Sequence, residues 1–299
     1  MAVSSTFRWF ILLILCLGVS GILAADEQEH PALWRVDSGD STLYLFGTMH
    51  LLPEGHAPLA PVIERAFEAS DVLVLEMNLS NLNQAEIQQL MFQRGLNTDG
   101  RRLSAIVGPE RWAEVRAAVE QVGLQPVLLE GMQPWLAGMT LTLSSLHQLG
   151  MRPDQGVESY LLRQAGEDME VRELEKFREQ LGVLANLSEQ TQIALLMQTA
   201  REMDDLETIT RQTLEAWSAG DVAAQERYLL ETYSDYPDLY QALIVDRHRN
   251  WLPQLEAMLA EPGTYFIAVG ALHLVGEDSV LDGLRRAGHA PERVRERGG

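Results

Sequence analysis

The strongest constraint on the fold is a pattern that occurs twice, once near each end of the chain. Residues 41–50 read STLYLFGTMH and residues 264–273 read TYFIAVGALH, so each copy is an apolar run followed by Gly-x-x-His. Continuous apolar runs bounded by turn residues are typical of strands that are buried on both faces. Glycine at the strand end permits a tight turn or a close approach of the backbone to a bound group. The repeat predicts that two matching strands deliver His50 and His273 to one site, whereas a single Gly-x-x-His is more often a structural turn.

The segments between the two copies predict an α/β fold. A helix ending near Ser70 and an apolar strand over 71–77 follow the first copy, and strand, helix and strand in this order predict a βαβ unit with parallel strands. Another strand is expected over 169–174, while most of 84–260 has helical periodicity. We therefore predict a mixed α/β (α+β) fold. Helices flank a central, largely parallel sheet, and 84–260 forms a large helical insertion around one core strand.

The N-terminal segment reads as a secretory signal peptide, because a basic residue precedes an apolar run at 10–19 and small residues follow it. Residues 1–25 are therefore predicted to direct export to the periplasm or the cell exterior, and an uncleaved N-terminal membrane anchor is the alternative. We expect the mature chain, residues 26–299, to form a single domain. Cys16 is the only cysteine, so the exported protein would contain neither a disulfide nor a thiolate ligand.

The overall charge limits the partners that the surface can attract. A formal net charge of −20 argues against binding to nucleic acid and against electrostatic binding to anionic lipid. The apolar stretch 135–149 is shorter than a membrane span and contains polar residues, so we interpret it as a core helix and expect no stable membrane insertion of the mature chain. The basic residues 293–297 are expected to be a frayed terminus. The oligomeric state stays open.

A carboxylate at a third strand end joins the two histidines as a candidate. Glu76 closes the apolar run VLVLE, where a buried carboxylate must be paired, hydrogen-bonded or bound to metal. Ligands of parallel sheets gather beyond the carboxyl ends of strands, so we expect Glu76 near His50 and His273. Two histidines and a carboxylate are a familiar ligand set for a divalent ion, and Mn, Co, Zn and Fe(II) all accept it. Such an ion activates water near neutral pH for attack on a carbonyl. Glu76 would then be a ligand, a group that orients a histidine, or a general base; the alternative is a salt bridge to an arginine.

Other charged residues compete with this set. Glu158, Glu173 and Glu175 follow a turn or a predicted strand, where a glutamate is more often solvated or capping. Residues 246–249, DRHR, form a polar cluster on an otherwise amphipathic helix. Within it, Arg247 is a candidate catalytic residue that would polarise an oxyanion, although a surface charge is the default interpretation. The sequence contains no nucleophilic serine turn and no phosphate-binding loop, so serine and P-loop chemistries have no support.

Six stretches resemble the successive blocks of the TraB/GumN family: LWRVDSGDSTLYLFGTMHLLPEG, ASDVLVLEMN, DQGVESYLL, VRELEKFREQL, VDRHRNWLPQLEAML and FIAVGALHLVGEDSVLDGLRRAGH. This family is similar to the Tiki proteins, metal-dependent proteases that act on Wnt proteins, and to a pheromone-shutdown protein of bacteria. The resemblance implies an EreA/ChaN-like α/β fold and a metal held by His50, His273 and Glu76. Arg247 matches an arginine of the helical block, but this chain has Arg247-His248 where the family pattern leads us to expect Arg-Asn.

These observations lead to hypotheses of two classes. In the first, the protein is an exported metal-dependent hydrolase, a protease or peptidase in which His50, His273 and Glu76 hold one divalent ion and the substrate is a peptide or protein. In the second, it is a noncatalytic envelope protein that binds haem, metal or a small ligand in the same cleft, or acts through its helical insertion. Turnover with added Mn, Co or Zn separates the first from the second, and a haem absorbance band favours the second.

Overall fold

The computed structural model describes three segments of the chain, 30–78, 84–234 and 236–295. The predicted signal peptide, with Cys16, lies outside them. The described residues group into two compact units, a helical unit and a sheet unit. The helical unit consists of 84–150 and 177–209. The sheet unit consists of 30–78, 151–176, 210–234 and 236–295. Each unit is therefore assembled from segments that are distant in the sequence, and the single-domain organisation of 26–299 stays a prediction.

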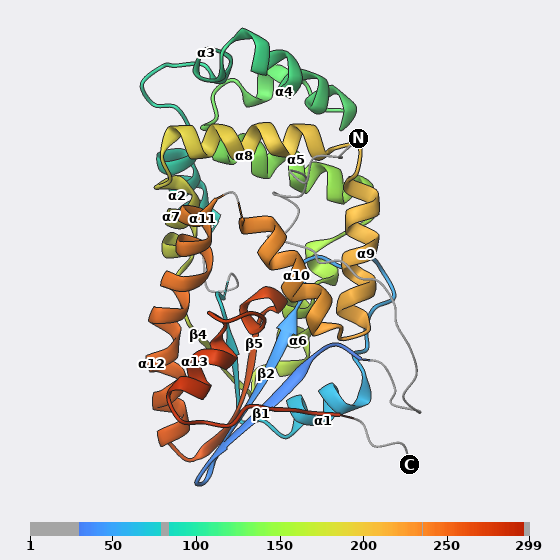
Figure 1. Cartoon of the computed structure of the whole chain (residues 1–299), viewed down its shortest axis with the longest axis vertical. Coiled ribbons are helices and arrows are strands. Elements are labelled where there is room, and N and C mark those ends of the chain that lie inside the picture. Colours follow the sequence, from blue (N-terminus) through green and yellow to red (C-terminus); the bar gives the residue numbers. More distant parts are fainter. Residues whose placement is uncertain (1–29, 79–83, 235, 296–299) are drawn as a thin grey trace. The chain divides into compact units, whose positions relative to one another are not determined.

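The sheet unit is built on six strands in the order β4-β3-β5-β2-β1-β6. The strands are β1 (Leu33–Ser38), β2 (Ser41–Thr48), β3 (Val72–Leu75), β4 (Glu170–Glu173), β5 (Gly263–Gly270) and β6 (Glu292–Arg293). Strands β4, β3, β5 and β2 run parallel, and β1 and β6 add an antiparallel edge. The predicted α/β class with a largely parallel sheet is confirmed. The two strands that carry Gly-x-x-His, β2 and β5, are direct neighbours (Figure 1).

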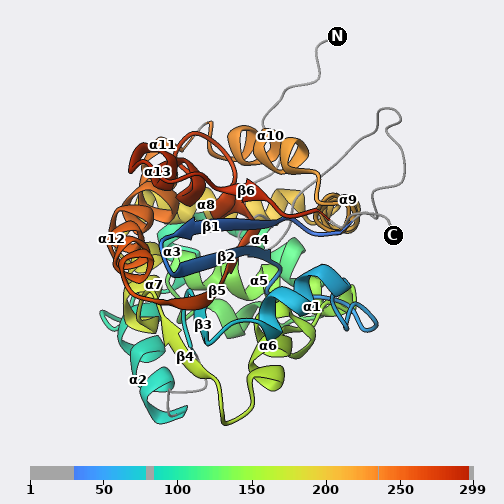
Figure 2. The same cartoon turned by 90° about the horizontal axis from the view of Figure 1, so that it is seen from below.

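Helices cover both faces of this sheet. The helices and helical turns of the unit are α1 (Pro61–Glu68), a 3-10 turn (Pro153–Gln155), α6 (Val157–Ala165), α10 (Val222–Tyr233), α11 (Pro237–Tyr240), a π-helical turn (Gln241–Val245), α12 (Asp246–Ala260), a 3-10 turn (Ala271–Leu274) and α13 (Val280–Arg286). Helix α9 (Leu206–Ser218) begins in the helical unit and continues into the sheet unit. Figure 2 shows α12 and α13 on one face of the sheet and α1 and α6 on the other.

The apolar strands fill a core on each side of the sheet. Leu43 and Leu45 of β2 pack with Leu255 of α12 in one buried cluster. On the opposite face, Phe266 of β5 meets Phe67 of α1 edge-on, with 5.4 Å between the ring centroids. Full burial of a side chain of this size stabilises a fold by about 1.5–3 kcal/mol. The ends of β2 and β5 are therefore anchored in well-packed structure.

The helical unit has a core of its own. Its elements are α2 (Gln84–Gly95), α3 (Leu103–Val107), α4 (Pro109–Gln121), a 3-10 turn (Pro126–Leu129), α5 (Pro134–Gln148), α7 (Phe177–Ala185) and α8 (Glu189–Glu202). Helix α8 packs against both α4 and α5. Trp135 of α5 is fully buried and its indole N–H donates to the carbonyl oxygen of Arg94 at 3.1 Å. The apolar stretch 135–149 thus forms a largely buried helix, as predicted. Among the described residues, no helix is both long and apolar enough to cross a membrane.

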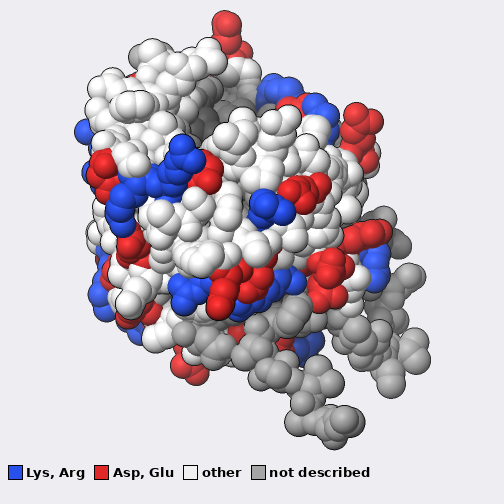
Figure 3. Space-filling model, turned by 90° about the horizontal axis from the view of Figure 1, so that it is seen from above, with Lys and Arg blue, Asp and Glu red and all other residues white. Residues whose placement is uncertain are grey.

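Charged side chains of both signs are interspersed on the face of the molecule that Figure 3 shows. Independently of this view, Nε of Arg101 in the helical unit lies 2.6 Å from Oδ2 of Asp99, and Nη1 of Arg101 lies 2.8 Å from Oε2 of Glu189. Exposed ion pairs of this kind contribute little to stability, because water and salt screen them. On this face the acidic residues do not gather into one continuous field.

Two details differ from the expectations. Arg293, expected in a frayed terminus, lies in β6, pairs with Trp34 of β1 and donates to the carbonyl oxygen of Gly220 at 3.3 Å. The open edge of β1 explains this, because an edge strand offers backbone groups that a second strand can pair. Residues 296 and 297 of that tail lie outside the described residues. The strand predicted over 169–174 is present as β4, but it forms the other edge of the sheet and is partly exposed.

Candidate functional site

Four parallel strands end at one edge of the sheet, and each delivers a polar side chain there. Thr48 of β2 pairs with Gly270 of β5, so the two Gly-x-x-His turns leave the sheet at the same level. Glu76 follows β3 and Glu175 follows β4, and the backbone N–H of Glu175 donates to the carbonyl oxygen of Glu76 at 2.9 Å. The carboxyl ends of parallel strands are where ligands bind in open α/β sheets.

The three predicted ligands converge on one glycine. A Cβ at Gly270 would lie 3.2 Å from Oε1 of Glu76, 3.5 Å from Nε2 of His50 and 3.6 Å from Cδ2 of His273. Any larger residue would therefore fill the space that these side chains face. The structure thus brings together side chains from β2, β3 and β5, and the glycine of the second motif leaves room between them.

Glu76 is buried and fully engaged. Only 4% of its surface is exposed. Its Oε1 accepts from the backbone N–H of Gly270 at 2.6 Å, and its Oε2 accepts from Arg247 at 2.6 Å. Burial by itself would raise the pKa of Glu76, but the Arg247 guanidinium and the other neighbours hold that pKa well below its usual range. Glu76 is therefore a carboxylate across the ordinary pH range.

Arg247 is a buried cation rather than the surface charge expected by default. It is 6% exposed and donates from Nε to Glu175 at 3.0 Å and from Nη1 to Nε2 of His273 at 2.9 Å. Its guanidinium also lies 4.6 Å from the centroid of the Trp251 ring, within cation–π range. Helix α12 places Arg247 one turn before Trp251 and two turns before Leu255, on its buried face. One guanidinium thus connects two carboxylates and a histidine.

His50 is held by a carboxylate from another part of the chain. Its Nδ1–H donates to Oε1 of Glu158 at 2.8 Å, and the hydroxyl of Thr48 donates to the same oxygen. Gly156 lies directly against the backbone carbonyl of His50, where a Cβ would collide, so glycine is required two residues before Glu158. Loss of hydration lowers the pKa of His50, but the Glu158 carboxylate more than offsets this and raises the pKa to about 9. The side chain of His50 is 39% exposed.

His273 is held by a second histidine. Its Nδ1 lies 2.8 Å from Nε2 of His248, and Nδ1 of His248 lies 2.6 Å from the carbonyl oxygen of Asp278. The side chain of Asp278 accepts from the hydroxyl of Tyr240 at 3.1 Å. Burial lowers the pKa of His248 to about 4 and takes the pKa of His273 well below its usual value. Both imidazoles are therefore neutral near pH 7.

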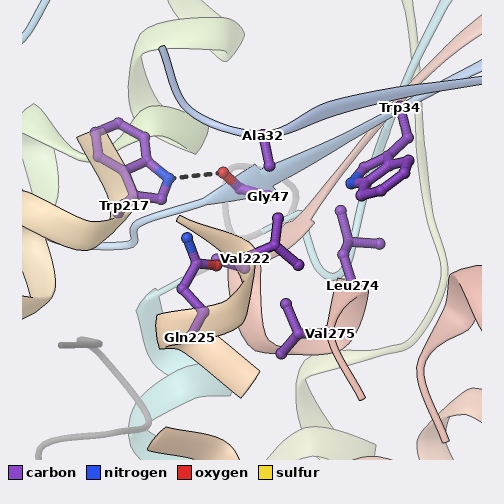
Figure 4. Close-up of a pocket in the computed structure, with 9 residues that line it drawn as sticks. Ala32, Trp34, Gly47, Trp217, Val222, Gln225, Leu274 and Val275 are labelled. Atoms are coloured by element: carbon purple, nitrogen blue, oxygen red, sulfur yellow. Dashed lines mark hydrogen bonds between the residues drawn. The ribbon is translucent and has the colours of Figure 1, made fainter. Parts of the chain in front are cut away.

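The far sides of the two turns pack against each other. Gly47 lies against Ala271 of the second turn, and the indole N–H of Trp217 donates to the carbonyl oxygen of Gly47 at 2.8 Å (Figure 4). Trp34 and Leu274 line the small apolar cavity beside this contact. These contacts at Gly47 hold the two turns against each other.

Sequence patterns missed three of these partners. Glu158 and Glu175, interpreted as solvated or capping residues, are instead bonded to His50 and Arg247, which come from distant parts of the sequence. Glu173 accepts from the backbone N–H of Asn78 at 3.0 Å. His248 was visible only as part of a polar cluster. The signal that could have placed Arg247 inside is the apolar stripe of α12, which extends back to it.

The imidazole nitrogens and the carboxylate suit a divalent ion, but Arg247 is hydrogen-bonded to two of these groups, His273 and Glu76. Within the described segments, no group of three His, Cys, Asp or Glu side chains is arranged to hold a metal ion. Arg247 donates to Nε2 of His273 and to Oε2 of Glu76, two atoms that a metal could use. The room at Gly270 and the two imidazoles with a carboxylate fit such an ion chemically, provided that the guanidinium releases Nε2 of His273 and that His50, whose raised pKa favours the protonated ring, gives up the proton on Nε2.

These features define a class of α/β protein in which two Gly-x-x-His turns on neighbouring parallel strands surround a buried glutamate. The chain belongs to the TraB/PrgY/gumN family, whose model matches residues 32–293, and the family expected from the sequence is thereby confirmed. It is similar to two proteins named "Uncharacterized protein YbaP", from Escherichia coli (strain K12) and Shigella flexneri. Each is 27% identical over 264 residues, which cover 88% of this chain and 95% of the relative. No solved structure matches the chain.

Proposed function

We propose that the protein is a metal-dependent hydrolase of peptide bonds, with His50, His273 and Glu76 as ligands of one divalent ion. The observation that carries this proposal is the convergence of the three side chains on Gly270, within 3.6 Å of the position of a Cβ. Imidazole nitrogens and a carboxylate oxygen are accepted by Zn, Mn, Co and Fe(II) alike, so the donor set does not select among these metals.

The charge of the cluster also favours a cation. Glu76 and Glu175 are both buried and share the single guanidinium of Arg247. Burial, together with the nearby charge of Glu76, raises the pKa of Glu175 in spite of Arg247. A second buried carboxylate without its own counter-charge is costly. A divalent ion beside Glu76 would offset the surplus.

Arg247, Glu76 and His50 would have separate roles in hydrolysis. A divalent ion supplies Lewis-acid polarisation of a carbonyl and acidifies water. Arg247 would keep Glu76 ionised and oriented, and its guanidinium would donate to the negative charge that develops on a substrate carbonyl oxygen. Glu76 would serve as a ligand or as the general base. His50, the more exposed histidine, would hold its Nε2 toward Gly270 because Glu158 engages its Nδ1.

Elemental analysis of protein purified without added metal tests the ligand set. We expect metal in the wild type and the loss of most of it in His50→Ala and in His273→Ala, because each variant lacks a ligand. His147→Ala is the matched control, since His147 is exposed on α5 in the helical unit. Full metal occupancy in both site variants would show that the paired Gly-x-x-His sequences are structural turns.

Glu76→Gln separates the two roles of Glu76, because it keeps the shape and removes the charge. Weaker metal binding would identify a ligand, whereas retained metal with slower turnover would identify a base. The activity itself is tested with a peptide library and added Mn, Co or Zn. A metal-loaded wild-type protein that cleaves no peptide would contradict the proposed reaction.

One observation favours a second candidate function. Arg247 already satisfies acceptor atoms of Glu76 and His273, which makes the cluster a complete ion-pair network without metal. In that case the protein would be a noncatalytic envelope protein that binds haem, metal or a small ligand at the same site. A haem absorbance band, or metal retention without turnover, would support this candidate.

Export stays part of the proposal. The leader pattern at 1–25 leads us to expect a mature chain that begins near Asp26 and is found in the envelope fraction. N-terminal sequencing of that material tests the expectation. Met1 on protein from the cytoplasm would contradict it.

A further inference from the structure

A chain of hydrogen bonds runs from a backbone carbonyl through two buried imidazoles to Arg247. Nδ1 of His248 lies 2.6 Å from the carbonyl oxygen of Asp278, and Nε2 of His248 lies 2.8 Å from Nδ1 of His273. Nε2 of His273 lies 2.9 Å from Nη1 of Arg247. The two histidines are 2% and 6% exposed, so these bonds are shielded from solvent.

The chemistry of the two ends fixes the direction of every bond between them. A carbonyl oxygen only accepts, so Nδ1 of His248 carries a proton; a guanidinium only donates, so Nε2 of His273 presents a lone pair. A neutral imidazole has one donor and one acceptor, so Nδ1–H of His273 donates to the bare Nε2 of His248. No other assignment of two neutral rings satisfies all three bonds. A further proton on either ring would bring two donors face to face.

Packing fixes the planes of the rings. The His248 and His273 rings are 5.0 Å apart between centroids and meet at 72°. Trp251, which is fully buried, lies 4.7 Å from His273 and 5.6 Å from His248. Helix α12 supplies both Trp251 and His248, so one rigid element sets the rotation of the His273 ring.

We propose that His248 is a positioning residue. It holds His273 as the Nδ1–H tautomer, so that the lone pair of Nε2 faces Nη1 of Arg247 at 2.9 Å, beside Oε1 of Glu76, which lies 3.4 Å from that nitrogen. The inference rests on the proposed function in one respect: a lone pair in this direction is what a metal-binding imidazole requires. The tautomer itself does not depend on a metal, so it can be measured separately.

Three substitutions separate the hydrogen bond from the bulk of the ring. His248→Phe keeps an aromatic ring beside Trp251 but has no polar atom. His248→Gln places an amide oxygen near the position of Nε2, so it still accepts from His273. His248→Asn reaches only as far as Nδ1, so it keeps a partner for Asp278 and loses the one for His273. His147→Phe, at an exposed position of the helical unit, is the control.

Long-range ¹H–¹⁵N correlation spectra of labelled, metal-free protein at one fixed pH report which nitrogen of each imidazole carries the proton. His273→Ala identifies the signals of His273. We expect Nδ1–H for His273 in the wild type, in His248→Gln and in the control. We expect Nε2–H, or an exchanging mixture, in His248→Phe and His248→Asn. In these variants Nδ1–H loses its acceptor, whereas a proton on Nε2 has Oε1 of Glu76 within 3.4 Å, and Arg247 can turn from Nε2 and keep its bonds to the two carboxylates. Unchanged Nδ1–H in His248→Phe would overturn the proposal, and if that variant does not fold, unchanged Nδ1–H in His248→Asn does so.

The affinity of the same proteins for Zn²⁺ shows whether the hydrogen bond between His248 and His273 affects metal binding. Loss of a group that orients a metal-binding imidazole weakens binding by about 10–100-fold, and we expect this in His248→Phe with rescue by His248→Gln. Equal affinities in the wild type and His248→Phe would overturn the role of His248 in the site. A wild type that shows the Nδ1–H tautomer and binds no Zn²⁺ would support the positioning role and refute the proposed metal site.

Discussion

His50 and His273 end the same sequence motif, but the fold gives them different neighbours. His50 is bonded to the carboxylate of Glu158, and its side chain is 39% exposed. His273 is bonded to the neutral imidazole of His248, and its side chain is 8% exposed. Their pKa values accordingly move in opposite directions, to about 9 for His50 and well below the usual value for His273. A repeated motif therefore does not imply two equivalent histidines.

The glycines of the two motifs differ in the same way. Gly47 faces the other turn, where a Cβ would lie 3.1 Å from Cα of Ala271. Gly270 faces the site, where a Cβ would approach the side chains of Glu76 and both histidines. The first glycine supplies a packing contact and the second leaves space, so the same Gly-x-x-His motif has different structural roles in the two turns.

The largest effect is expected on the His273 side, at Arg247. Arg247→Met removes a buried cation that donates to His273 and leaves two buried carboxylates without it. Breaking a buried ion pair from one side costs about 3–5 kcal/mol, and urea unfolding measures it. Arg249→Met is the control on the same helix, because its side chain is 69% exposed and its loss costs at most about 1 kcal/mol. Similar costs for the two variants would mean that the cluster is not a structural centre.

Acid should also act on the His273 side. The pKa of His248 is about 4 in the folded protein, against about 6.5 in an unfolded chain. The unfolded state therefore binds more protons between these values, so stability falls as the pH drops through this window, by up to about 3 kcal/mol. Unfolding of metal-free protein from pH 7.5 to 4 measures the loss, and His248→Gln should lessen it. An identical pH profile for the variant would show that His248 titrates normally.

The two glycines should respond differently to replacement by alanine. Gly47→Ala forces a methyl group against the backbone of Ala271 and should cost about 1–3 kcal/mol, as overpacking does. Gly270→Ala meets the ends of side chains that can shift, so we expect a smaller loss of stability but a loss of metal binding. Thermal unfolding and metal content of both variants decide the matter. A Gly270→Ala protein with full metal content would remove the distinction between the two turns.

The smallest effect is expected on the His50 side, in alkali. Because the folded pKa of His50 is raised to about 9, its stabilising contribution is present below about 6.5 and is lost as the pH rises through 9. The side chain is partly exposed, so solvent screening keeps this contribution below about 1 kcal/mol. An NMR titration of His50 measures the pKa directly, and Glu158→Gln should lower it. A pKa that is the same in both proteins would exclude Glu158 as the cause.

Local patterns predicted much of the fold because they depend on neighbours in the sequence. The apolar runs form β2, β3 and β5, and the stretch after Pro134 forms α5. The spacing of apolar residues indicates whether a segment is buried on both faces, as a central strand is, or along one stripe, as a helix is. Ser188 begins α8 as its N-cap and accepts from the backbone N–H of Thr191 at 3.1 Å, which is a contact between near neighbours in the sequence. The tail at Arg293 escaped prediction because its strand exists only by pairing with β1.

The residues of the candidate site also fall into two groups, those that the sequence indicated and those that only the fold revealed. The sequence by itself singled out His50, His273 and Glu76, because a polar residue that closes an apolar strand must end at the edge of a sheet. Only the tertiary structure decided that Glu158 holds one histidine and His248 the other, and that Arg247 lies inside rather than at the surface. The physical reason is that burial and hydrogen-bond direction depend on which distant segments pack together. Residue type and spacing determine which groups can do chemistry, and packing determines their charge, their orientation and their partners.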